Sequence, residues 1–119
     1  HLTTQSTVLI KTQYSWKSRF EEGVGTNPEE LIASAHAGCY TMKLSFVLGG
    51  ANYTPEMIEA KCDITLEAGV ITKSELYVTA KVPGITAEEF TKLAEEAHAG
   101  CLVGKLFVCE KSLVSATLA

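Results

Sequence analysis

The pentapeptide AHAGC occurs twice in this sequence, at residues 35–39 and 97–101, and each copy places a histidine three residues before a cysteine. In a helix, residues three apart lie on one face, so each copy would present an imidazole and a thiol side by side. The two pairs could supply four nitrogen and sulfur ligands to a zinc ion. Alternatively, the two thiols could meet each other, or the pentapeptide could mark a duplicated structural unit.

The metal and duplication hypotheses are the weaker ones. Zinc sites more often pair closely spaced cysteines at turns, and histidines in apolar helices are commonly satisfied by local hydrogen bonds. We therefore interpret His36 and His98 as packing or local hydrogen-bonding residues. The flanks do not support a duplication, because the first copy continues into a long apolar segment whereas the second is followed by Gly104 and a β-like run.

Cys39 lies in an apolar segment, where a cysteine is usually an inert small hydrophobic residue. Two charged residues, if they lie near Cys39, could make its thiol reactive. Arg19 is the only arginine of the chain, and Glu29 belongs to the first turn of the predicted helix that carries Cys39. If Arg19 folds back over this helix, its guanidinium would lower the pKa of the Cys39 thiol and could pair with Glu29. A solvated surface arginine is the alternative.

The other three cysteines differ in their settings. Cys101 ends the apolar stripe of a second predicted helix, so we expect its thiol to point inward. Cys62 shares the inward phase of a predicted strand and is interpreted as a core residue. Cys109 lies in the last β-like run and is interpreted as core or inert.

The first half of the chain predicts one or two strands and then a long helix. Residues 5–17 are β-branched and aromatic enough for strands. Asn27 suits a helix N-cap, Pro28 the first helical position, and Glu30 stands where a capping box needs it. From Pro28 to about Leu48 the segment is apolar on nearly every side, which predicts a central, buried helix.

The second half predicts a hairpin, a helix and a strand. Residues 58–67 and 70–82 alternate between apolar and polar side chains around a turn containing Gly69, as in an antiparallel hairpin. Thr86 and Glu89 form a second capping box, and a last β-like run covers roughly residues 107–118. The order predicts an α+β fold in which the long buried helix and a second helix pack against an antiparallel sheet.

Length and composition bound the class of protein. The 119 residues suit a single domain over residues 1–119, and the absence of a leading methionine suggests that an N-terminal segment is missing. No uninterrupted apolar run reaches the length of a membrane span. A net charge of −4 with scattered lysines argues against nucleic acid as a partner. The chain has enough apolar residues to fold without disulfides and shows no signal-peptide pattern, so we expect a cytoplasmic protein.

Three stretches together resemble a known family: RFEEGVGTNPEELIASAHAGCYTMKLSFVLG, VPGITAEEF and the second AHAGC. From about Ser6 to Leu118 the chain is similar to the OsmC branch of the OsmC/Ohr family of thiol-dependent peroxidases. By position, the resemblance implies that Cys39 is the peroxidatic cysteine and Cys101 the resolving cysteine. It also implies that Arg19 activates the Cys39 thiolate and that Glu29 holds this arginine.

The resemblance further implies an intertwined homodimer with two active sites at the subunit interface, and a further strand ahead of His1. Family members reduce organic hydroperoxides, and hydrogen peroxide less efficiently, without a metal or flavin cofactor, and take electrons from dihydrolipoyl-type dithiols. This chain has Leu102 and Gly104 where the family often has proline and serine. The competing hypothesis is a non-catalytic domain of the same fold that binds a small ligand or zinc.

Overall fold

The computed structural model describes residues 1–15 and 25–119, which divide into two compact units, residues 1–32 and residues 33–119. In the first unit, isolated bridges join Leu2 to Thr12 and Tyr14 to Thr26. The prediction of regular strands is wrong for residues 5–15, because left-handed backbone at Thr7 and Lys11 interrupts the extended chain. Residues 16 and 17 of that prediction lie outside the described residues. The single-domain interpretation stays a prediction.

The long helix, α2 (Pro28–Gly50), begins as predicted. The Asn27 side chain accepts a hydrogen bond from the Glu30 backbone N–H at 2.9 Å, and Pro28 opens the helix, where it needs no N–H partner. A cap of this kind stabilises a helix by about 1 kcal/mol. The first turn also carries Glu29.

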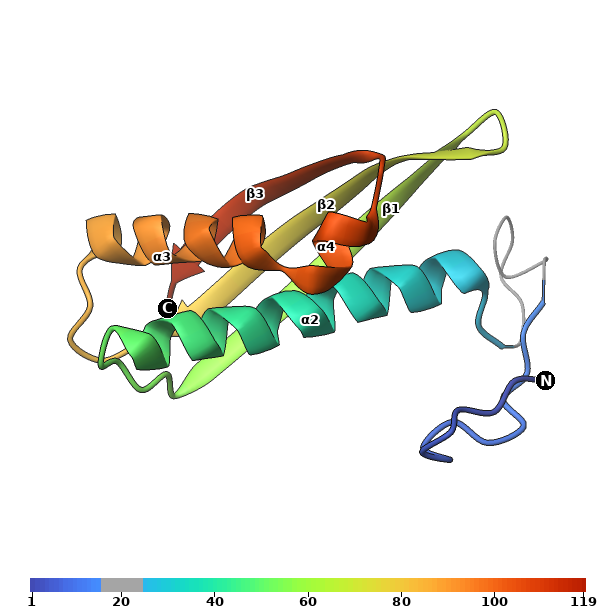
Figure 1. Cartoon of the computed structure of the whole chain (residues 1–119), viewed down its shortest axis with the longest axis horizontal. Helices are drawn as coiled ribbons and strands as arrows, with labels where there is room; N and C mark the ends of the chain where they lie inside the picture. Colours follow the sequence, from blue (N-terminus) through green and yellow to red (C-terminus); the bar gives the residue numbers. More distant parts are fainter. Residues whose placement is uncertain (16–24) are drawn as a thin grey trace. The chain divides into compact units, whose positions relative to one another are not determined.

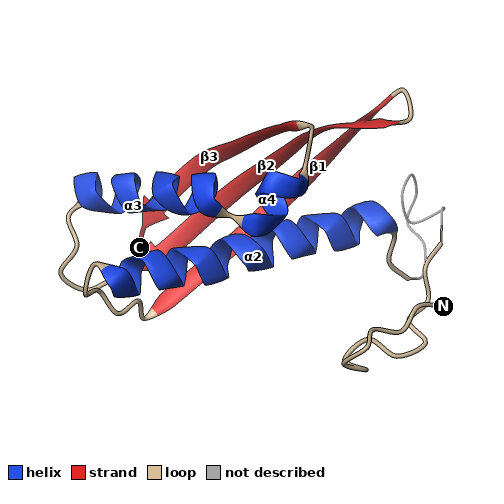
Figure 2. Ribbon diagram, in the orientation of Figure 1, coloured by secondary structure: helices blue, strands red, loops and turns tan. Residues whose placement is uncertain are grey.

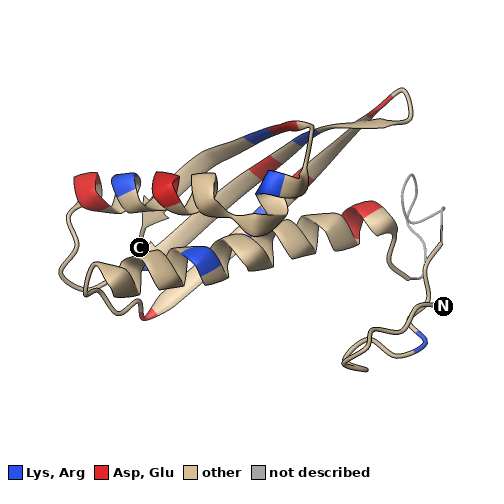
Figure 3. Ribbon diagram, viewed as in Figure 1, with Lys and Arg blue, Asp and Glu red and all other residues tan. Residues whose placement is uncertain are grey.

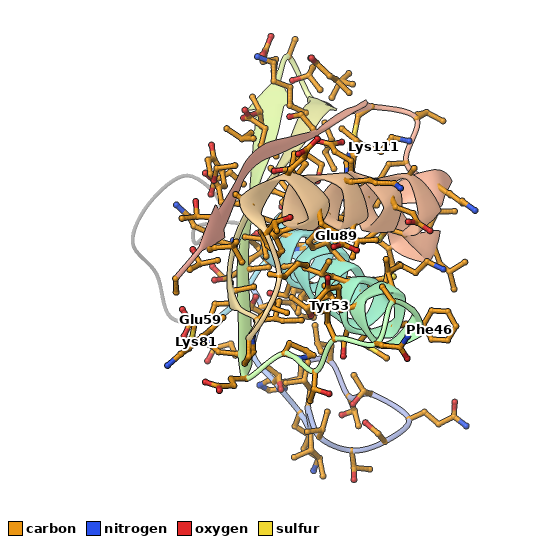
Figure 4. All side chains as sticks on the ribbon, turned by 90° about the vertical axis from the view of Figure 1, so that its left-hand side faces the viewer. Phe46, Tyr53, Glu59, Lys81, Glu89 and Lys111 are labelled. Carbon is orange, nitrogen blue, oxygen red and sulfur yellow. The ribbon has the colours of Figure 1, made fainter. Side chains whose placement is uncertain are left out.

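Within the single chain, α2 is buried along one side rather than all round. Its fully buried side chains are four residues apart: His36, Tyr40, Leu44 and Leu48. The opposite side exposes Met42 and Phe46, with 74% of Phe46 accessible, and Figure 4 shows Phe46 pointing away from the sheet. The difference arises because one chain provides only one layer for α2 to pack on. By length and mean hydropathy α2 could cross a membrane, but core helices of soluble proteins pass the same test.

The hairpin is confirmed as β1 (Met57–Glu67) and β2 (Val70–Lys81), which pair antiparallel. Ala68 and Gly69 between them both have positive φ, 50° and 78°, as the tight primed hairpin turns require. The buried side chains of β2 alternate with more exposed ones: Ser74, Leu76, Val78 and Ala80. A serine therefore occupies an inward position in a row of apolar residues.

The predicted second helix is α3 (Ala87–Gly100), where the Thr86 hydroxyl caps the Glu89 N–H at 3.1 Å. A short helix that the sequence did not reveal, α4 (Leu102–Leu106), follows directly after Cys101. The chain then returns as β3 (Glu110–Leu118). Since α3 and α4 carry the chain back along the sheet, β3 re-enters in the direction of β2 and pairs with it in parallel.

The sheet has the order β1-β2-β3 and is mixed, which corrects the antiparallel sheet expected from the sequence, while the α+β class is confirmed. In the unit of residues 33–119, the helices cover one face of the sheet (Figures 1 and 2). The core joins Tyr40 and Leu44 of α2 to Leu76 and Val78 of β2 and to Phe90 of α3. Lysines and acidic residues are interspersed along the elements in Figure 3.

Candidate active site

Cys39 lies midway along α2, half-buried, and its sulfur contacts the first residues of α4. The backbone N–H of Val103 donates a hydrogen bond to this sulfur and is the largest influence that lowers the pKa of the Cys39 thiol. The Cys101 thiol and the Leu102 N–H also donate to it, whereas partial burial acts in the opposite direction. The net pKa lies below that of an ordinary cysteine, and thiolate is the nucleophilic form of the residue.

Cys101 is fully buried at the junction where α3 ends and α4 begins. Burial is the main cause that raises the pKa of its thiol. The N–H groups of Gly104 and Val103 donate to the Cys101 sulfur and partly offset this rise, while the neighbouring Cys39 adds to it. The structure thus brings two free thiols together, one disposed to ionise and one to keep its proton.

His36, one helical turn before Cys39, is wholly buried and belongs to a polar cluster with Ser74 and Cys62. Its Nδ1 lies 2.6 Å from the Ser74 hydroxyl of β2, and the same hydroxyl lies 3.2 Å from the Cys62 sulfur of β1. His36 is hydrogen-bonded, but its partner is Ser74 on β2 and not a local group as the sequence predicted. His98 is half-buried, and its Nδ1 has no hydrogen-bond partner among the described residues.

The remaining predicted site residues are only partly covered. Arg19 lies outside the described residues. Glu29 is placed in the first turn of α2, half-exposed, as expected for a residue on the helix that carries Cys39. The catalytic roles of both residues stay predictions.

The described residues offer no zinc site, and the depression that they do form does not include the two thiols. Over residues 1–15 and 25–119, no three histidine, cysteine or acidic side chains gather as metal ligands would, so the two His and Cys pairs do not converge into a zinc site. An open depression of about 320 Å³ lies between α2 and β1, lined by residues such as Met42, Ser45 and Met57. Neither Cys39 nor Cys101 belongs to its lining.

Sequence reasoning missed two features of this site. The N–H groups of Leu102 and Val103 belong to α4, a helix of five residues too short to show a periodic pattern. Ser74 left a detectable signal, since it is a polar residue in the inward phase of β2. An inward serine calls for a hydrogen-bond partner, but the sequence did not indicate that His36 would supply it.

Residues 21–114 match the sequence model of the OsmC-like protein family. The chain is 43% identical over 116 residues to the peroxiredoxin OsmC of Escherichia coli K12, spanning 94% of this chain and 81% of that protein. The peroxiredoxin OsmC of Shigella flexneri matches with the same identity and coverage.

Solved structures support the fold. An organic hydroperoxide resistance protein from Elizabethkingia anophelis, with thiocyanate bound, aligns with a TM-score of 0.76 and 23% identity, over 98% of this chain and 86% of that one. A similar protein from Legionella pneumophila aligns with a TM-score of 0.75 and 20% identity, over 98% and 87% of the two chains.

Proposed function

This chain belongs to the OsmC family, and from that premise we propose that it is a thiol-dependent peroxidase that reduces organic hydroperoxides and, less efficiently, hydrogen peroxide. The observation that carries the proposal is the pairing of Cys39 with Cys101 beside the N–H groups of α4. Its relatives in Escherichia coli and Shigella flexneri are named peroxiredoxins, which agrees with this chemistry.

In the first step, the Cys39 thiolate attacks the terminal oxygen of the hydroperoxide. An S–O bond forms and the O–O bond breaks, so that the hydroxyl group stays on Cys39 as a sulfenic acid. The departing alkoxide takes a proton from water and leaves as the alcohol. The N–H groups of Val103 and Leu102 stabilise the attacking thiolate. Arg19 is proposed to add a fixed positive charge beside this thiolate, and Glu29 to hold the arginine in place.

In the second step, the Cys101 sulfur attacks the sulfenic sulfur, forming a disulfide and releasing water. An external dithiol, proposed to be of the dihydrolipoyl type, then reopens the disulfide by exchange. The interaction between the two thiols supports this order, because the two sulfurs have to meet for the disulfide to form. No step requires a flavin or a metal.

The proposal includes a homodimer in the cytoplasm. Exposed apolar side chains occur in pairs four residues apart on two helices, Met42 with Phe46 on α2 and Leu102 with Leu106 on α4. A second copy of the chain that covers these pairs would also shield the half-buried Cys39 thiol, since Leu102 supplies an N–H to its sulfur. Large exposed apolar surface of this kind marks interaction sites.

The test measures consumption of cumene hydroperoxide by the reduced protein with dithiothreitol as electron donor. We expect Cys39→Ser to abolish turnover, because a serine hydroxyl does not ionise at neutral pH and forms no sulfenic acid. Cys109→Ser is the matched control and should consume peroxide like the wild type, since this cysteine lies outside the described thiol pair. Unchanged consumption by Cys39→Ser, or stoichiometric zinc protecting the thiols of the purified protein, would contradict the proposal.

A further inference from the structure

The buried imidazole of His36 has a hydrogen-bond partner at only one of its two ring nitrogens. Its Nδ1 lies 2.6 Å from the Ser74 hydroxyl, and that hydroxyl contacts the Cys62 sulfur. The edge of the ring packs against Phe107, with centroids 5.0 Å apart and planes at 78°. If Nδ1–H donates to Ser74 and the serine hydroxyl donates to Cys62, the two hydrogen bonds form a chain that fixes the orientation of the imidazole.

The other ring nitrogen, Nε2, lies beside Gly104, which is also next to the Cys101 sulfur. It is buried and finds no hydrogen-bond partner among the described residues. A side-chain carbon built on Gly104 would lie 3.2 Å from this Nε2 and 3.8 Å from the Cys101 sulfur. Nε2 and the Cys101 sulfur therefore lie no more than 7.0 Å apart, on the two sides of Gly104, with no hydrogen bond between them. The Gly104 N–H donates to the same sulfur.

The surroundings of His36 keep the imidazole neutral at physiological pH. Burial is the main cause that lowers its pKa, and His98 and Lys111 lower it further. Titratable groups lie near it on each neighbouring element: Cys62 on β1, His98 on α3, Cys101 between α3 and α4, and Lys111 on β3. A neutral imidazole whose Nδ1 donates to Ser74 has a free lone pair at Nε2, on the side of Cys101.

We propose that His36 accepts the thiol proton of Cys101 during disulfide formation. The inference rests on the proposed function, which supplies the Cys39 sulfenic acid. As the proton moves from the Cys101 sulfur to Nε2, the sulfur attacks the Cys39 sulfur, the S–S bond forms and the S–O bond breaks. The hydroxide that leaves takes the proton back from the imidazolium and departs as water, so His36 ends neutral.

A proton acceptor is needed because Cys101 must lose its proton before it attacks the sulfenic acid. Burial raises the pKa of Cys101, so simple ionisation leaves little thiolate at neutral pH. A base within the protein removes the proton only when the sulfenic acid is there to be attacked. The same raised pKa keeps Cys101 protonated in the resting state, in which its thiol donates to the Cys39 sulfur.

The experiment mixes reduced protein with one equivalent of cumene hydroperoxide. Samples quenched at increasing times are analysed by mass spectrometry for dimedone-trapped sulfenic acid on Cys39 and for the disulfide. For His36→Asn, whose amide can keep the hydrogen bond to Ser74, we expect sulfenic acid at the wild-type rate. The disulfide should form about 100-fold more slowly at pH 7, the scale of general base catalysis.

A pH series separates this role from a structural one. The wild-type rate of disulfide formation should rise with pH only while His36 loses its proton, which its lowered pKa places at acidic pH. From about pH 7 to 8.5 the rate should stay constant. In His36→Asn, the rate should increase about tenfold per pH unit, because Cys101 then has to ionise by itself. Tyr40→Phe removes another buried hydrogen bond of α2, to the Ala94 carbonyl, and should keep both the rate and the flat profile.

Each result decides between the two proposals. Wild-type protein that forms no sulfenic acid overturns the peroxidase proposal and this inference together. Sulfenic acid followed by equally fast disulfide formation in His36→Asn, with an unchanged pH profile, overturns the role of His36 alone. Should His36→Asn not fold, the wild-type series still decides, because a tenfold rise per pH unit between pH 7 and 8.5 would show that Cys101 ionises without an acceptor.

Discussion

The candidate site contains two neighbouring thiols whose pKa values move in opposite directions. Cys39 is half-buried and accepts hydrogen bonds from backbone N–H groups, of which that of Val103 contributes most. Cys101 is fully buried, and desolvation dominates its pKa. In the proposed mechanism, a low pKa suits Cys39, which attacks as thiolate, and a high pKa suits Cys101, which stays protonated until the sulfenic acid has formed.

The sign of the Cys39 shift can be measured through its rate of alkylation. Because only the thiolate reacts with iodoacetamide, a lowered pKa makes the rate level off at a lower pH than for an ordinary thiol. We expect Cys39 of the folded protein, followed by peptide mass spectrometry, to level off at lower pH than the same residue in urea. In Cys101→Ala, which loses one donor, the curve should move up in pH while staying below the unfolded reference. Coincident folded and unfolded curves would contradict this assignment.

At the scale of elements, the sequence predicted those elements whose signals are local. The caps at Asn27 and Thr86 and the alternation on both sides of Gly69 fixed α2, α3 and the hairpin to within a few residues. The direction of β3 could not be predicted, since it depends on how α3 and α4 carry the chain over the sheet. The prediction of regular strands over residues 5–15 was wrong, because left-handed turns interrupt this segment despite its β propensity.

The candidate site divides in the same way. Its two cysteines could be picked out from the repeated pentapeptide and the family resemblance, and the structure brings them together. Their partners come from tertiary packing, which places α4 against the middle of α2. Leu102 supplies a backbone N–H at this position, which the proline that the resemblance led us to expect would lack.

Leu102→Pro tests what this N–H contributes. Proline is tolerated at the first position of a helix, and Cys101 before it already has the extended backbone that proline favours, with φ −65° and ψ 121°. We expect normal folding and a higher pKa for Cys39, because one donor to its sulfur is lost. The rate of sulfenic acid formation at pH 7 should fall about threefold to tenfold, the effect of one modest hydrogen bond.

Leu102→Ala is the matched control, since it removes the same exposed side chain and keeps the N–H. Its rate of sulfenic acid formation should equal that of the wild type. Equal rates in Leu102→Pro and the wild type would mean that this donor does not act on Cys39.

At the scale of the molecule, residues 33–119 bury one side of their helical layer and leave apolar side chains on the other. Exposed fractions are 76% for Met42, 74% for Phe46 and 78% for Leu106. Side chains of this size are normal on a surface when scattered, but here they repeat at helical spacing on two elements. In a two-fold dimer, the same surface of both copies would be covered, so these apolar side chains would be buried on each chain. This favours the proposed dimer.

Phe46→Glu tests this assembly. A charge at the centre of an apolar interface would be buried without a partner, so we expect the variant to lose the dimer in size-exclusion chromatography with light scattering. Thr91→Glu places the same charge on the exposed side of α3 and should leave the dimer intact.

If the sites need the second copy to exclude water, monomeric Phe46→Glu should retain the Cys39 thiol yet consume cumene hydroperoxide more slowly. A wild-type chain that is monomeric at micromolar concentration, or a Phe46→Glu variant that stays dimeric, would remove the exposed side of α2 from the interface.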